Sequence, residues 1–211
     1  MGKVKIKKKS VWIDMTPMSD VMVLLLTFFM LTATFTKNEA VKVNTPGSVS
    51  EIKVPEKNAL SILIDKEGKV FLGMDRPSSQ KTLVQAVAGE YGVNLTEEQL
   101  KTAEGTTNVG VPMDQLSKMF AMEPAEINKF QETLGLPTDS VDGKQSQFQD
   151  WVMAARDNFG EDMKITLKAD CDTPYKVVKK VMSEMQDISE DRYYLVTTLK
   201  TGAQIQWRRK K

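Results

Sequence analysis

The sequence predicts a single N-terminal transmembrane helix followed by an α+β domain, with helices on one face of a small mixed β-sheet and a helical insertion. Two observations lead to this class. Residues 12–35 form one long apolar run behind a lysine-rich start, and the remainder of the 211 residues combines strand-like alternation with helical periodicity. With 41% hydrophobic and 27% charged residues, the chain has the composition of a globular protein with one core.

Composition also excludes several functions. The chain contains no histidine and a single cysteine, Cys171, so the commonest general base and metal ligand is missing and no intramolecular disulfide can form. A net charge of +1 gives no nucleic-acid signal. Asp170, Cys171 and Asp172 suggest a metal site or a reactive thiol, but a strand end followed by a helix cap explains them better. We therefore expect no enzyme, no cofactor or metal, and no nucleic-acid partner.

The apolar run is predicted to cross a membrane. Residues 15–35 give a helix of about 32 Å, close to the ~30 Å hydrocarbon core of a bilayer. Thr16 is a good N-cap residue and Pro17 is favoured in the first turn. Five lysines lie in the preceding tail, residues 1–11, so the positive-inside rule places the N-terminus in the cytoplasm and the domain on the other side.

A cleaved signal peptide is the alternative for this segment, because a basic start also precedes an apolar stretch in such peptides. Asp14 and Asp20 argue against it, and "TATFT" matches the small-residue cleavage pattern only weakly. We therefore expect a retained anchor.

Asp20 is the unusual residue of the run. An acid at the centre of an inserted helix costs about 2.5–3.5 kcal/mol on an insertion scale, so a simple anchor would carry an apolar residue there. Thr16, Asp20, Thr27 and Thr34 are spaced 4, 7 and 7 residues apart, which places them on one stripe of a helix. The stripe is typical of a polar contact between helices or of an acid that carries protons beside a polar path.

The next segments are predicted from turn residues and alternation. Residues 36–58 contain prolines, glycine and serines and indicate an extended linker. Residues 61–65 and 69–73 flank a turn with Gly68, which predicts a β-hairpin. These strands open a domain over residues 59–203.

Helical periodicity dominates the middle of the domain. Within a helical insertion at about residues 81–144, helices are expected at 80–92, 96–104, 113–121 and 123–134. A further apolar face runs from Phe148 to Phe159. Beyond it we expect a strand at 163–168, a helix capped by Asp172 or Thr173 with Pro174 in its first turn, and a last strand at 192–199. Residues 204–211 form a basic tail.

Four stretches resemble the ExbD/TolR biopolymer-transport family. They are Thr16-Pro17-Met18-Ser19-Asp20-Val21-Met22, "AVKVNTPGS" (40–48), "LSILIDKEGKVFLGMD" (60–75) and "MKITLKADCDTPYKVVKKVMSEM" (163–185), in the order the family has them. The insertion is longer than family members need, so the resemblance says little about it.

The resemblance implies a stator subunit of a proton channel in the inner membrane of a Gram-negative cell, with the C-terminal domain in the periplasm. It implies a homodimer surrounded by an ExbB/TolQ-like multi-span protein, an output through a TonB- or TolA-like transducer, and contact with peptidoglycan. The proton-carrying role is transferred to Asp20 alone.

The linker is interpreted as regulating the coupling between span and domain, for instance by adding a strand to an exposed sheet edge. The residues concerned are Val41, Lys42, Val43, Asn44 and Pro46. Two alternatives remain: a motor subunit that powers wall tethering or gliding, and a signal-anchored periplasmic binding or scaffolding module without proton-channel activity.

Overall fold

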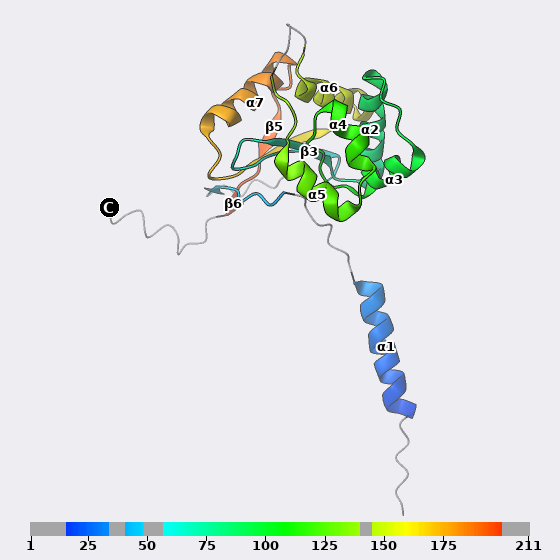
Figure 1. Cartoon of the computed structure of the whole chain (residues 1–211). Coiled ribbons are helices and arrows are strands. Elements are labelled where there is room, and N and C mark those ends of the chain that lie inside the picture. The colour runs from blue at the N-terminus through cyan, green and yellow to red at the C-terminus, as the bar shows by residue number, and fades with distance from the viewer. Residues whose placement is uncertain (1–15, 34–40, 49–56, 140–144, 200–211) are drawn as a thin grey trace, which may run out of the picture. The chain divides into compact units, whose positions relative to one another are not determined.

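The computed structural model of the chain, shown in Figure 1, describes residues 16–33, 41–48, 57–139 and 145–199. The chain divides into two compact units, residues 1–37 and 38–211, and each is described by itself. The first unit contains α1 (Thr16–Thr32), a helix of 17 residues. In the described part of the chain, no helix combines the length and the apolar character needed to cross a membrane.

The second unit is built on a four-stranded mixed sheet, which confirms the predicted sheet type. Its strands are β2 (Ala59–Ile64), β3 (Val70–Met74), β4 (Lys164–Ala169) and β5 (Tyr193–Leu195), in the order β3-β2-β4-β5. β2 and β3 form the antiparallel hairpin, and Gly68 takes a positive φ of 83° in its turn. β2–β4 and β4–β5 are parallel pairs.

The helices of this unit follow the predicted periodicity. They are α2 (Pro77–Glu90), α3 (Glu97–Gly105), α4 (Met113–Phe120), α5 (Pro124–Thr133), α6 (Gln147–Phe159) and α7 (Tyr175–Asp187). The chain from β3 to β4 is thus mainly helical, seen largely in green in Figure 1, and the predicted insertion at about residues 81–144 lies within it. Capping boxes begin two of the helices, with Thr96 and Gln99 at α3 and Ser146 and Gln149 at α6.

The helices pack on one face of the sheet and form the main core. Leu60, Ile62 and Ile64 of β2 alternate towards this core, which also contains Trp151 of α6 and Met185 of α7. Leu63 and Phe71 point to the opposite face, where they form a small second cluster. The β2–β3 part of the sheet is therefore covered on both faces, and the described helices of this unit lie on the face of the main core.

Two details differ from the sequence prediction. The expected strand 192–199 is divided into β5 and β6 (Thr198–Leu199), and β6 pairs in parallel with β1 (Gly47–Ser48) instead of continuing the main sheet. The predicted cap of α7 is also wrong. The N-cap is Pro174, because the Thr173 hydroxyl is engaged elsewhere and donates to the Asp65 carbonyl at 2.9 Å.

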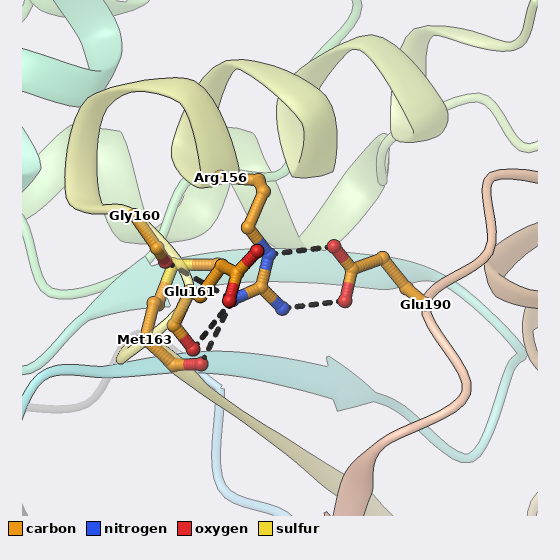
Figure 2. Close-up of polar contacts among 5 residues, drawn as sticks. All are labelled: Arg156, Gly160, Glu161, Met163 and Glu190. Atoms are coloured by element: carbon orange, nitrogen blue, oxygen red, sulfur yellow. Dashed lines mark hydrogen bonds and ion pairs between the residues drawn. The ribbon is translucent and has the colours of Figure 1, made fainter.

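Arg156 joins three parts of the domain, as Figure 2 shows. Its Nε and Nη2 donate to the two carboxylate oxygens of Glu190, at 2.6 and 2.5 Å, in a bidentate ion pair. Its Nη1 donates to the carbonyls of Gly160, Glu161 and Met163. The hydrogen bond with Glu190 raises the pKa of the guanidinium. One side chain thus fixes the end of α6, the loop to β4 and the segment after α7.

The insertion also closes one edge of the sheet. Leu72 of β3 exchanges two backbone hydrogen bonds with Val109, and the Leu136 amide donates to the Val70 carbonyl. Edge strands expose unpaired backbone groups that attract other strands, so these contacts remove a site of uncontrolled pairing. The close approach depends on Gly110, because a Cβ there would lie 2.0 Å from Cδ1 of the Phe71 ring.

We expect Gly110→Ala to lower the free energy of unfolding by about 1–3 kcal/mol, the usual cost of overpacking a filled interior. Gly89→Ala is the matched control, because nothing lies within 4 Å of its added Cβ and the position is helical. That variant should be neutral or stabilised by up to about 1 kcal/mol. Urea unfolding of both variants measures the difference, and equal stabilities would contradict this packing.

Candidate functional site

The candidate proton-carrying residue, Asp20, lies in the first half of α1. No hydrogen bond or ion pair joins its carboxylate to another described residue. The Thr27 hydroxyl donates to the carbonyls of Val23 and Leu24, at 2.9 and 3.0 Å. Its hydrogen-bonding capacity as a donor is therefore used within its own helix. The Asp20 carboxylate therefore has no compensating partner among the described residues of α1.

Large apolar side chains of α1, from Met18 to Leu31, lie on both sides of Asp20 along the helix, and we name them the apolar sleeve. Every large apolar side chain of α1 between Met18 and Leu31 is more than half exposed in this unit. Burying one such side chain is worth about 1.5–3 kcal/mol, so these side chains of α1 favour an apolar environment. Thr16 begins α1, but its side chain and Thr34 lie outside the described residues, so the predicted polar stripe stays a prediction.

Residues 41–48, which we name the strap, lie on the folded domain. Val41 is buried and packs with Leu63 and Phe71, and Val43 is packed against the same cluster. This is the sheet face opposite the helices. Lys42, between the two valines, is exposed. The strap thus buries alternate side chains, as a strand does.

Polar contacts hold the rest of the strap. The Asn44 amide donates to Asp170 Oδ2 at 2.9 Å, and the Cys171 amide donates to the Asn44 carbonyl at 2.9 Å. The Thr198 amide donates to the Pro46 carbonyl at 3.1 Å, just before β1 pairs with β6. Hydrogen bonds therefore attach the strap to the residues that follow β4 and to β6.

Asp170 is the electrostatic centre of this attachment. Hydrogen bonds from the Asp172 amide and then the Asn44 amide lower the pKa of its carboxyl below the ordinary 3.8. Because the pKa of Asp170 is lowered, its ionised carboxylate stabilises the docked strap fully at pH values above the ordinary pKa. This stabilisation is lost as the pH falls through the lowered pKa. The strap should therefore remain attached at neutral pH and loosen only in acid, below about pH 4.

We expect Asp170→Ala to speed hydrogen exchange of the Asn44 amide by about tenfold or more, since one lost charge-assisted hydrogen bond is worth about 1.5–3 kcal/mol. Asp172→Ala is the control, because the exposed Asp172 contributes only its backbone amide to the contact. NMR of the Asn44 amide against pH gives the second measurement. Equal exchange in the two variants would show that Asp170 does not hold the strap.

Sequence reasoning missed the receptor of the strap, which consists of Leu63, Phe71 and Thr198. A signal for it was present. "SILID" and "KVFLG" are apolar at both alternating positions, which is typical of strands that are covered on both faces. Asp170 was recognised only as a strand end.

The structure thus defines a class: an apolar helix carrying one carboxylate, joined by a short strap to a mixed α/β domain. Comparison with protein-family models matches residues 7–200 to "Biopolymer transport protein ExbD/TolR". The chain belongs to the ExbD/TolR family. No curated protein and no solved structure matched it.

Membership settles the general role of the chain. The family energises biopolymer transport, works in the ExbB/TolQ and TonB/TolA systems, and is not a family of enzymes. It points to the inner membrane as the place of action.

Proposed function

We propose that the chain is a stator subunit that uses the proton-motive force to energise a TonB- or TolA-type transducer, for transport across the outer membrane or for its maintenance. Residues 12–35, which include α1, would cross the inner membrane with the N-terminus in the cytoplasm and the domain in the periplasm. The observation that carries the proposal is the single carboxylate, Asp20, on an otherwise uncharged and mainly apolar helix of a chain in this family.

In this account Asp20 takes up a proton from one side and releases it towards the cytoplasm. Two copies of the helix would stand inside an ExbB/TolQ-like ring, whose interior would cover the apolar sleeve. One charge moved across 100 mV is worth about 2.3 kcal/mol, comparable with the cost of placing the carboxylate in the membrane. Thr16, Thr27 and Thr34 would lie beside the proton path.

The strap would regulate the coupling of the helix to the domain. Its docked form shortens the free chain between α1 and the sheet, and its release would lengthen that connection so that the domain can engage the transducer or peptidoglycan. The support for this role is the alternation of Val41 and Val43 with exposed Lys42, together with the contacts of Asn44 and Pro46.

Locking the strap tests this role. The hydroxyls of Thr45 and Thr198 lie 2.6 Å apart, so Thr45→Cys with Thr198→Cys, in a Cys171→Ser background, should form a disulfide. We expect oxidation to reduce energy-dependent output several-fold and a reductant to restore it. Each single cysteine variant is the control. Full output with the disulfide formed would exclude a regulatory release of the strap.

The alternative function is a signal-anchored periplasmic binding or scaffolding module without proton-channel activity. The observation in its favour is that the domain has a complete core of its own. Asp20→Asn separates the two functions, because a binding module should be indifferent to the charge on its anchor. A reporter enzyme fused after residue 211, active only in the periplasm, tests the orientation that both require.

A further inference from the structure

An unusual surface lies where the end of α2 meets the outer face of α6. It is formed by Glu90, Tyr91, Asp150, Met153 and Asp157 and is named the α2–α6 surface. The α6 residues are spaced 3 and 4 apart, so they share one helix face, and the Tyr91 hydroxyl donates to Asp150 Oδ2. The described domain leaves four large hydrophobic side chains exposed, and two of them, Tyr91 and Met153, are on this surface.

Three carboxylates, those of Glu90, Asp150 and Asp157, share this surface with the two apolar side chains, and none of them forms an ion pair with a cation of the described residues. Burial first, and then the charges of Asp150 and Asp157, raise the pKa of Glu90, and no basic group of the described chain acts against this. Arg156, on the same helix, is engaged by Glu190. A ligand for such a surface needs positive charge together with an apolar or aromatic group.

The chain itself supplies a segment of this chemistry. Residues 207–211 read Trp-Arg-Arg-Lys-Lys, one large aromatic followed by four cations. Trp207 follows Leu199, where β6 ends, by eight positions, and these eight steps of the chain span at most about 26–29 Å. A domain of this size has a radius of about 19 Å, so the fully extended tether is longer than one radius of the domain.

Charge complementarity, composition and tether length together favour the same chain as the source of the ligand. A tethered segment is present at an effective concentration in the millimolar range, so even weak contacts suffice. We propose that residues 207–211 dock on the α2–α6 surface of their own chain, with Trp207 against Tyr91 and Met153 and the four cations facing the carboxylates.

A photo-crosslinking residue at position 153 of the full chain tests the proposal. The expected result is an intramolecular cross-link to residues 204–211, identified by mass spectrometry, with the protein running as a monomer on a denaturing gel. The same crosslinker at Glu126, an exposed residue of α5 outside the surface, is the control and should not reach the tail. Equal yields at the two positions, or no link to the tail, would overturn the proposal.

Charge reversal provides the second arm. Arg208→Glu with Arg209→Glu, which changes no residue of the described domain, should lower the yield at least fivefold, and adding Glu90→Lys with Asp157→Lys should restore it. Reversal of Glu97 and Glu98 on α3, with the same change in net charge, should not restore it. If the Glu97 and Glu98 reversal restored the yield as well as the Glu90 and Asp157 reversal does, net charge alone would explain the effect. That result would overturn the docking site. A cross-linked dimer in place of the monomer would assign the tail to a second copy and overturn docking within one chain.

Discussion

Asp20→Asn is expected to reduce the energy-dependent output of the chain by about 50-fold, measured as the rate of the energised step in cells that lack the wild-type protein. The amide has nearly the size of the carboxyl but cannot gain or lose a proton. The helix then loses the work of one charge in a 100 mV field, about 2.3 kcal/mol, which corresponds to that factor. No other side chain of α1 between Thr16 and Thr32 is acidic or basic.

Two companion variants make the result specific to proton transfer. Asp20→Glu keeps a titratable group and should retain part of the output. Thr27→Val removes a hydroxyl that bonds only to its own helix and should change the output little. Immunoblots must show equal protein levels. Normal output of Asp20→Asn at equal levels would support the binding-module alternative.

Arg156→Ala is expected to lower the free energy of unfolding of the domain by about 2–4 kcal/mol. The change leaves Glu190, whose side chain is only 15% exposed, without its partner, and it frees three carbonyl acceptors at once. Removing one member of a buried pair costs about 3–5 kcal/mol, and the 23% exposure of Arg156 reduces this. Urea denaturation followed by circular dichroism measures the change.

Arg156→Lys and Lys180→Ala set the scale of that effect. The lysine keeps the charge but cannot form the bidentate pair, so an intermediate loss is expected. Lys180 pairs with Asp139, whose side chain is 84% exposed, and its removal should cost less than about 1 kcal/mol. Similar losses for Arg156→Ala and Lys180→Ala would contradict the role of Arg156 as a junction.

Local patterns predicted most of the fold. The helices of the insertion were expected within a few residues of α2 to α5, because their apolar spacing and prolines act within single segments. The hairpin and the strand that became β4 followed from alternation and from Gly68. Apart from the hairpin, the strands were predicted from single segments. Because a strand that packs on both faces is apolar on both, its sequence did not indicate which strands it pairs with.

Contacts between distant segments were not predictable in the same way. The division of 192–199 depends on the strap, which lies about 150 residues earlier in the chain and captures Thr198. The Arg156–Glu190 pair likewise joins residues 34 positions apart, and nothing in either neighbourhood specifies the other. At the candidate site, Asp20 was identifiable because a lone acid in an apolar run is costly wherever it occurs.

Proton flux tests the central claim most directly. The chain and an ExbB/TolQ-like multi-span partner would be reconstituted into liposomes, and an internal pH-sensitive dye would follow acidification after a membrane potential is applied. The account predicts flux with the wild-type chain and none above the partner alone with Asp20→Asn, at equal incorporation of both proteins. Equal flux through the Asn variant would contradict the assignment of Asp20 as the proton carrier.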